Sequence, residues 1–165
     1  MANKLRVGIV GAGNIAVSAH LPSYMELKDM VEVVAIADIV PERAKAAAEK
    51  FGIPHYFASV EELLENVDVD YVDICTWTAA HAPVCIAAAK AGKHILCEKP
   101  LAANLEQGLA MEKAVREAEQ YAAEDKARKE EVDTHNNAEH LIYQTEKTLA
   151  DLGDKATDSE RSAIQ

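Results

Sequence analysis

The chain has 165 residues, with 17 Lys and Arg against 28 Asp and Glu, so its formal net charge is −11. This length is enough for the core of one ordinary domain and a smaller appendage. The negative charge disfavours nucleic acids and anionic membranes as partners, because both would be repelled over most of the surface. No apolar stretch reaches the roughly 20 residues of a membrane span, and no secretory leader pattern opens the chain, so we expect a cytoplasmic protein.

The first predicted unit is a buried strand, a glycine turn and a helix. The apolar strand ends at Val10 and leads into the turn Gly11-Ala12-Gly13-Asn14-Ile15-Ala16. In such a turn Gly11 makes the tight bend, Gly13 lets backbone N–H groups approach a phosphate, and the small Ala16 lets the helix lie close to the strand. The free N–H groups and the positive end of the helix dipole favour an anion. The pattern predicts a site for a dinucleotide pyrophosphate, with Asn14 and Ile15 in contact with the cofactor.

An acidic residue follows at the distance that this pattern requires. A second apolar strand, residues 31–37, ends at Asp38, about 20 residues past the glycines, where a carboxylate would bind the adenosine ribose hydroxyls. The same carboxylate would repel a 2′-phosphate, and no Arg directly follows it, since Arg43 lies on the next predicted helix. We therefore expect NAD as the cofactor, with NADP the less favoured alternative. The structural alternative is a glycine turn and a strand-end Asp without a ligand.

Strands and helices then alternate up to about residue 103. Pro41 begins a helix that Gly52 ends, and Ser59 with Glu62 forms a capping box at the start of another. This alternation is typical of a parallel sheet with helices on both faces, a Rossmann-type doubly wound α/β fold with five strands. We expect helices at residues 41–50, 59–64 and 82–91, and the three later strands at residues 55–57, 69–75 and 93–97.

The character of the sequence changes after a further predicted helix over residues 105–117. Beyond it the chain contains neither a strand signal nor a Pro, and residues 117–165 hold 13 acidic residues against 6 basic ones. We expect this tail to be entirely helical, with a solvated stretch over residues 121–132. Gly153 is expected to end one helix and Thr157 with Glu160 to begin another. A small apolar group falls at helical spacing before that end: Leu141, Ile142, Leu149 and Leu152.

Three segments of the first part resemble the cofactor domain of the Gfo/Idh/MocA oxidoreductases over about residues 3–118. They are the glycine turn, the run Asp38-Ile39-Val40-Pro41-Glu42-Arg43-Ala44, and the run Ala91-Gly92-Lys93-His94-Ile95-Leu96-Cys97-Glu98-Lys99-Pro100-Leu101. The resemblance implies NAD(P)-dependent hydride transfer at a carbinol carbon of sugar- or polyol-like alcohols. It places Glu98 and Lys99 beside the nicotinamide ribose and the substrate, with Lys99 as the catalytic residue that assists polarisation or proton transfer.

The resemblance also places Thr76, Trp77 and His81 along the cofactor groove. Many members of the family have Thr-Pro-Asn after the fourth strand, whereas this chain has Thr76-Trp77-Thr78, so the contacts near the nicotinamide differ. For Trp77, filling a gap in the apolar face is an equally good account. For His81 and His20, a structural hydrogen bond is at least as good an account as contact with a ligand. Cys75, Cys85 and Cys97 have no paired spacing, so we expect buried thiols and no metal site.

The tail, residues 117–165, resembles a different family, the helical lid of DnaK-type heat-shock chaperones. The segments that carry this resemblance are residues 117–125, 132–138 and 143–149. We therefore expect two domains, a dinucleotide-binding domain over residues 1–118 and a helical lid-like segment over residues 119–165. A join between unrelated parents, natural, designed or misassembled, would explain this combination.

Three functions are compatible with these observations. The first is an NAD(H)-binding oxidoreductase domain with weak or absent turnover, because the family's substrate pocket and catalytic His belong to a second α/β domain that this sequence does not contain. The second is a nucleotide-binding module without a reaction, and the third is a helical interaction segment on an inert carrier. An open sheet edge at the fifth strand also favours self-association.

Overall fold

The computed structural model describes residues 4–152, apart from the side chains of residues 125, 126 and 149–152. By their internal contacts these residues form two compact units, one ending at Gln120 and the other beginning at Tyr121. The first unit contains every strand of the described part of the chain, and the second consists of helix. Among the described residues no helix is both long enough and apolar enough to cross a membrane.

A five-stranded parallel sheet organises the first unit. Its order is β3-β2-β1-β4-β5, so the chain builds outward from β1 in one direction and then returns to build on its other side. The strand order therefore reverses between β1 and β4, which is where doubly wound sheets bind their ligands. This confirms the Rossmann-type prediction, with these strands: β1 (Leu5–Val10), β2 (Val31–Ala37), β3 (His55–Phe57), β4 (Tyr71–Ile74) and β5 (His94–Cys97).

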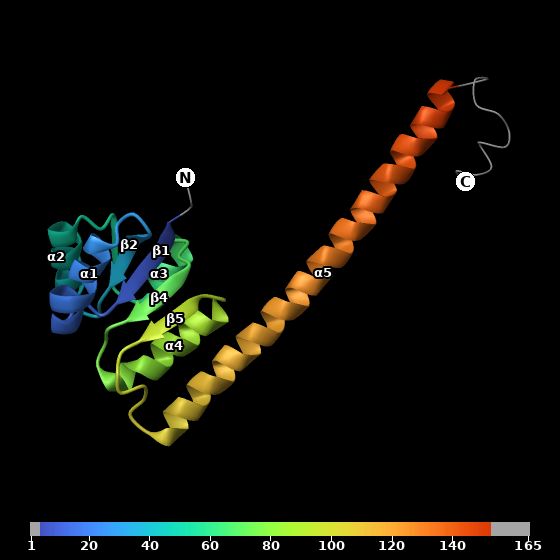
Figure 1. Ribbon diagram of the computed structural model, residues 1–165. Coiled ribbons are helices and arrows are strands. Elements are labelled where there is room, and N and C mark those ends of the chain that lie inside the picture. The colour runs from blue at the N-terminus through green and yellow to red at the C-terminus, as the bar shows by residue number, and fades with distance from the viewer. Residues whose placement is uncertain (1–3, 153–165) are drawn as a thin grey trace. The chain divides into compact units, whose positions relative to one another are not determined.

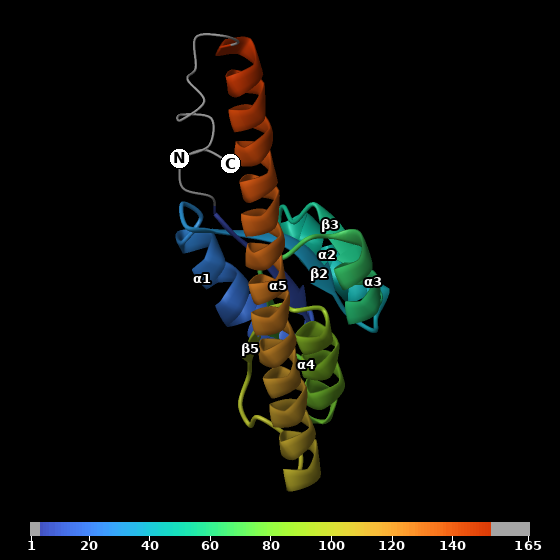
Figure 2. The ribbon, with the colours of Figure 1, turned by 90° about the vertical axis from the view of Figure 1, so that its right-hand side faces the viewer.

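Helices cover both faces of the sheet, and a separate apolar core fills each interface (Figures 1 and 2). Leu21 and Ala44 contribute to one core with Ile9 and Ile36, and Leu63 and Ala88 contribute to the other with Val72 and Ile74. In Figure 1, α1 and α2 lie to the left of the strands, α3 to the right and α4 below them, beneath β5. The helical elements are η1 (Ala16–His20), which is a π-helix, α1 (Leu21–Glu26), α2 (Pro41–Phe51), α3 (Val60–Asn66), η2 (Thr78–Ala80) and α4 (His81–Lys90).

The local start and stop signals act as the sequence predicts. Gly52 ends α2 in the left-handed conformation at φ 70°, and Ser59 begins α3 by accepting a hydrogen bond from the Glu62 N–H at 3.2 Å. The Glu62 carboxylate accepts from the N–H of Ala58 at 3.1 Å, one residue earlier than the usual capping box. The strand over residues 69–75 is shorter than predicted, because Asp70 lies in a loop where its carboxylate accepts the Arg6 N–H at 2.6 Å.

Helix α5 (Leu105–Leu152) is one continuous helix of 48 residues. The expectation of a helix ending near residue 117 and followed by separate helices is therefore wrong in that detail, although the helical character is correct. Met111 is buried in the core of the first unit and Val115 packs against it, whereas in the second unit every described side chain is exposed. Along such a helix, pairs four residues apart, such as Lys113 with Glu117 at 3.7 Å, add modest support. Gly153, Thr157 and Glu160 lie outside the described residues.

Replacing Ser59 with Ala should lower the free energy of unfolding by about 1 kcal/mol, because the N-terminal amides of α3 lose their side-chain acceptor. The measurement is the shift in urea midpoint at constant m-value. Ser23→Ala is the matched control, since the Ser23 hydroxyl donates to the Ala19 carbonyl on an exposed helix surface and caps nothing. Equal destabilisation by both substitutions would contradict the capping role.

Candidate dinucleotide-binding site

The glycine turn after β1 is held against the end of β4. Gly11 has φ 100°, and a Cβ at this position would lie 2.7 Å from the carbonyl carbon and oxygen of Cys75. Its N–H donates to the Ala37 carbonyl at 2.7 Å, so the turn also contacts the end of β2. No residue with a side chain fits at position 11 without moving backbone. A Cβ on Gly13, by contrast, would meet no atom within 4 Å, because this glycine faces open space.

The helix that follows the glycine turn begins with backbone amides that have no hydrogen-bond partner within the helix. The Val17 N–H donates to the Gly13 carbonyl at 3.1 Å and closes the first helical turn. The amides that precede Val17 have no carbonyl one turn earlier in the helix, as at any helix start. Ala16 is fully buried against the sheet, while Asn14 and Ile15 are exposed. The positive end of the helix is therefore available to an anion, as the sequence predicts.

Asp38 connects the end of β2 to the glycine turn. Its side chain is largely buried, and its two oxygens accept backbone hydrogen bonds, one from the N–H of Ala12 and one from the N–H of Val40, each at 2.8 Å. A carboxylate oxygen accepts more than one hydrogen bond, so both oxygens keep capacity for hydroxyl donors. The contact with Ala12, 26 residues away in sequence, fixes the carboxylate relative to the turn.

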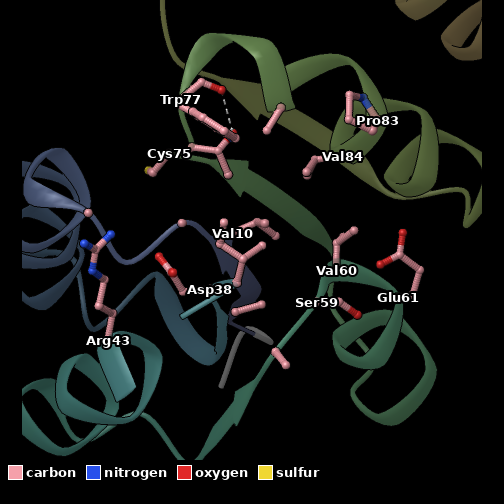
Figure 3. Close-up of a pocket in the computed structure, with 17 residues that line it drawn as sticks. Val10, Asp38, Arg43, Ser59, Val60, Glu61, Cys75, Trp77, Pro83 and Val84 are labelled. Atoms are coloured by element: carbon pink, nitrogen blue, oxygen red, sulfur yellow. Dashed lines mark hydrogen bonds between the residues drawn. The ribbon is translucent and has the colours of Figure 1, made fainter. Parts of the chain in front are cut away.

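A cavity of about 570 Å³ opens at this edge of the sheet, a size within the usual range for small-molecule sites. Five predicted cofactor residues line it: Gly11, Gly13, Asp38, Thr76 and Trp77. Figure 3 shows the Arg43 side chain on the same side of the cavity as the Asp38 carboxylate, with Trp77 and Pro83 bordering it from the α4 side. Trp77 is 70% exposed, so it does not fill a gap in the core.

The other predicted residues do not line this cavity. Asn14 and Ile15 lie on the first helical turn, and Glu98 and Lys99 lie just after β5. Lys99 is exposed, its N–H donates to Glu98 Oε2 at 3.1 Å, and its peptide bond to Pro100 is cis.

His81 is buried, and its two ring nitrogens face backbone carbonyls from two loops. Nε2 lies 3.1 Å from the Thr76 oxygen, and Nδ1 lies 3.0 Å from the Pro100 oxygen. The ring thus connects the loop after β4 to the loop after β5. His81 thus makes structural hydrogen bonds, one of the two roles that the sequence predicts for it beside contact with a ligand.

A second polar cluster lies beneath the same edge, and the sequence did not reveal it. Asp73 on β4 is fully buried, and its Oδ2 lies 2.7 Å from His20 Nδ1 and 2.9 Å from the Tyr24 hydroxyl that donates to it. The other ring nitrogen of His20 lies 2.8 Å from Glu98 Oε1. Asp73 Oδ1 is buried and has no hydrogen-bond partner in the part of the chain that the structure describes. For His20 the sequence predicts either a structural hydrogen bond or contact with a ligand, but nothing local pairs it with position 73.

The His20 ring and the Glu98 carboxylate shift each other's pKa. Burial alone lowers the pKa of His20, but its hydrogen bonds to Asp73 and Glu98 outweigh burial and raise the pKa above the ordinary value. The hydrogen bond from His20, with a smaller contribution from the Lys99 N–H, lowers the pKa of Glu98. Burial raises the pKa of the Tyr24 hydroxyl, which favours its role as a neutral donor to Asp73.

Within the described residues, His20, Asp73 and Cys75 each place one possible metal-ligand atom within 4.8 Å of the others. Both ring nitrogens of His20 and Asp73 Oδ2 already take part in hydrogen bonds, however. Burial raises the pKa of the Cys75 thiol, which disfavours the thiolate that a metal would need. We therefore treat the group as a hydrogen-bonded cluster.

Comparison with known proteins identifies the origin of this geometry. The sequence model of the family described as "Oxidoreductase family, NAD-binding Rossmann fold" (GFO_IDH_MocA) matches residues 5–126, most of the chain. The chain belongs to this family. The matched region extends beyond residue 118, into the stretch that resembles a chaperone lid, and none of these comparisons bears on that second resemblance.

Relatives in the family include enzymes named for polyols and sugars. The chain is 37% identical over 101 residues to the myo-inositol 2-dehydrogenase of Thermotoga maritima, covering 61% of the chain and 30% of that protein. It is 37% identical over 119 residues to the levoglucosan dehydrogenase of Pseudarthrobacter phenanthrenivorans, covering 68% of the chain and 30% of that protein. The chain thus spans about a third of the length of these relatives.

Solved structures of the family share the fold. The WlbA dehydrogenase of Bordetella pertussis, solved in complex with NADH and UDP-GlcNAcA, is 34% identical with a TM-score of 0.67, over 70% of this chain and 35% of that one. KijD10, a 3-ketoreductase of Actinomadura kijaniata solved with NADP and TDP-benzene, is 37% identical with a TM-score of 0.63, over 70% of this chain and 35% of that one.

Substitution by Ala should change the stability of this Gfo/Idh/MocA domain strongly at one turn glycine and little at the other. Gly11→Ala should destabilise the fold by about 2–4 kcal/mol, because it combines a positive φ with a clash against backbone. Gly13→Ala should leave unfolding within about 1 kcal/mol of wild type, since its Cβ meets no protein atom. Thermal and urea denaturation measure both. Destabilisation by Gly13→Ala as large as that by Gly11→Ala would contradict this assignment.

Proposed function

We propose that the cavity beside Asp38 binds NAD(H) and that the chain serves hydride transfer with sugar- or polyol-like alcohols. The observation that carries the proposal is the Asp38 carboxylate, which is fixed by the Ala12 and Val40 amides and lines the cavity beside the glycine turn. This arrangement suits two adjacent ribose hydroxyls with a pyrophosphate bound next to them.

We infer the direction of the bound dinucleotide from the strand order. In this proposal the adenosine ribose lies at Asp38 after β2, and the pyrophosphate lies at Gly13 after β1. The nicotinamide then falls beyond the reversal point, toward the ends of β4 and β5. Glu98 and Lys99 follow β5, so Lys99 is our proposed catalytic residue, assisting polarisation or proton transfer. The cofactor would contact Thr76 and Trp77 in the loop after β4, and Asn14 and Ile15 at the helix start. His81 would support the loop after β4.

We propose a preference for NAD over NADP. The negative charge of Asp38 repels a 2′-phosphate, while Arg43 lines the same cavity and would attract one. Asp38 lies closer to the turn and is held rigidly by two amides, whereas Arg43 is an exposed, flexible side chain. The solved relatives named above were crystallised one with NADH and the other with NADP.

We further propose that this 165-residue chain, tested by itself, turns over an alcohol weakly or not at all. Hydride transfer needs a bound cofactor, a bound alcohol and a positioned base. The residues discussed above supply the cofactor side of that arrangement, and the chain spans about a third of the length of its named dehydrogenase relatives. A non-catalytic nucleotide-binding module is the alternative, and a substrate-dependent change in NADH absorbance separates the two.

Titration with NADH tests the proposal directly, and the chain has a built-in probe. Trp77, the single tryptophan, lines the cavity, so its fluorescence should be quenched as NADH binds. Asp38→Ala should weaken NADH binding by about tenfold or more, because charge-assisted hydrogen bonds to the ribose are lost. Calorimetry should give the same affinities.

Asp29→Asn is the matched control, because Asp29 is an exposed acid just before β2, the strand that ends at Asp38. It should leave NADH affinity unchanged. Absence of NADH binding by a cooperatively folded wild-type chain would refute the proposed function.

Arg43→Ala tests the cofactor preference. It should weaken NADP binding more than NAD binding, because only NADP carries the 2′-phosphate that Arg43 would pair with. The same titration with NAD and NADP gives the ratio of affinities for wild type and variant. Unchanged ratios would exclude Arg43 from any contact with the cofactor.

For the second unit we propose a separate role, self-association through its exposed apolar side chains. This role agrees with the resemblance of the unit to a chaperone lid. Leu141, Ile142 and Tyr143 are adjacent in α5 and each is more than half exposed. The β5 edge of the first unit, with Leu96 about half exposed, is a second proposed contact.

Sedimentation velocity over a range of concentrations tests this role, with and without NADH. Replacing Leu141 and Ile142 together with Lys should reduce association through the helix, and Leu96→Lys should reduce association through the sheet edge. Val132→Lys, an exposed apolar position of the same helix outside the group, is the control. A chain that stays monomeric at every concentration would refute both contacts.

A further inference from the structure

His20 bridges two carboxylates from two different strands. Its Nδ1 lies 2.7 Å from Asp73 Oδ2 on β4, and its Nε2 lies 2.8 Å from Glu98 Oε1 just after β5. Asp73 is fully buried, whereas the His20 and Glu98 side chains are 17% and 20% exposed. The bridge therefore runs from the interior of the sheet to the loop at its carboxyl edge.

The bridge continues into the backbone of the loop. Glu98 Oε1 faces His20, and Glu98 Oε2 accepts the N–H of Lys99 at 3.1 Å. Both oxygens of Glu98 are thus engaged, which fixes the orientation of its carboxylate and of the Lys99 peptide. None of the residues in this bridge lines the cavity beside Asp38. Asp73, Glu98 and Lys99 belong to β4 and the loop after β5, past the reversal point of the sheet, where the proposed mode places the far half of a dinucleotide.

We propose that His20 is a positioning residue for the nicotinamide end of the site. By donating to Asp73 and Glu98 together, its ring holds the loop after β5 in the conformation that presents Glu98 and Lys99 to the cofactor. This inference rests on the proposed dinucleotide function. His20 lies outside the glycine turn, the Asp38 position and the loop after β5.

Double donation requires the protonated ring. A neutral imidazole carries one N–H and can donate to only one carboxylate, whereas the imidazolium donates to both. The pair of carboxylates raises the pKa of His20, so the protonated form persists to higher pH than in an isolated His. The other titratable groups around the ring's partners are two phenols and two thiols with raised pKa values and one exposed ammonium: Tyr24, Tyr71, Cys75, Cys97 and Lys99.

Deprotonation should release Glu98 and not Asp73. Asp73 is fully buried, and among the described residues only His20 and Tyr24 donate hydrogen bonds to its Oδ2, while its Oδ1 accepts none. Losing a donor there leaves a charge without solvent, whereas the partly exposed Glu98 can be hydrated. The single proton of the neutral ring therefore stays on Nδ1, and the loop after β5 loses its tether.

Comparing NADH with ADP-ribose isolates this effect, because ADP-ribose lacks the nicotinamide. His20→Gln should weaken NADH binding by about fivefold, the loss of one hydrogen bond, and leave ADP-ribose binding unchanged. In the wild-type chain the NADH to ADP-ribose affinity ratio should fall as pH rises through the titration of His20, and the variant should show no such fall. His94→Gln, an exposed His that begins β5, is the control and should behave as wild type.

The outcomes separate the two proposals. If neither ligand binds the wild-type chain, the proposed function fails. If both bind, and the affinity ratio is the same in wild type and His20→Gln at every pH, the positioning role is overturned while the function stands. Should His20→Gln not fold, Glu98→Gln keeps the Asp73 contact. It should lower both the NADH to ADP-ribose ratio and the pKa of His20 observed by NMR, and no change in either would overturn the inference.

The stability of the fold should also depend on pH through this bridge. Raising the pH should weaken the contribution of His20 and strengthen that of Glu98. The raised pKa of His20 stabilises the fold fully below the ordinary His value, and this stabilisation is lost as pH rises through the folded pKa. The lowered pKa of Glu98 stabilises the fold above the ordinary Glu value, and this stabilisation is lost as pH falls through the folded pKa. The difference in urea midpoint between wild type and His20→Gln should be largest between those two ordinary values.

Discussion

The hydrogen bond from the Ala12 amide to the Asp38 carboxylate is the contact on which the cofactor side of this fold depends. It joins the turn after β1 to the end of β2, so the proposed phosphate site and the proposed ribose site are held together. The backbone of Cys75 closes the same turn from the other side, where only the missing Cβ of Gly11 allows the approach. Three neighbouring strand ends thus form one rigid edge before any ligand arrives, and that preorganisation lowers the entropic cost of binding.

What the sequence predicted well was local. The glycine turn, the left-handed Gly52 and the Ser59 cap are each encoded within a few residues, and each is formed as expected. The alternation of strands and helices then leaves few ways to arrange a parallel sheet, so the strand order follows with little freedom. Helix continuity was harder to predict. No Pro or paired glycine marks an end near residue 117, and a charged, exposed sequence has no core contact that would bend or stop it.

The second polar cluster shows where prediction from the sequence fails. His20 and Asp73 are 53 residues apart, and His20 and Glu98 are 78 apart, so no local pattern joins them. Asp73 lies inside an apolar strand, where alternation directs Val72 and Ile74 to one face and Asp73 to the other. The reason for the burial of Asp73 becomes visible only in the fold, where η1 places a ring nitrogen of His20 against it. A single charged residue in an otherwise apolar strand, together with a His soon after a glycine turn, is the signal that could have indicated the pair.

The two ends of the site hold their carboxylates by different means. Asp38 is held by two backbone amides, which do not change their protonation in the neutral pH range. Glu98 is held by an imidazole and by one amide, so its geometry depends on whether that ring is protonated. In the proposed binding mode, the adenosine half of the dinucleotide would contact the Asp38 end, and the nicotinamide half would contact the end that depends on the protonation of His20. In that proposed mode, loss of the His20 proton would loosen the nicotinamide end while the Asp38 end still holds the cofactor, so anchoring and reaction would be separated.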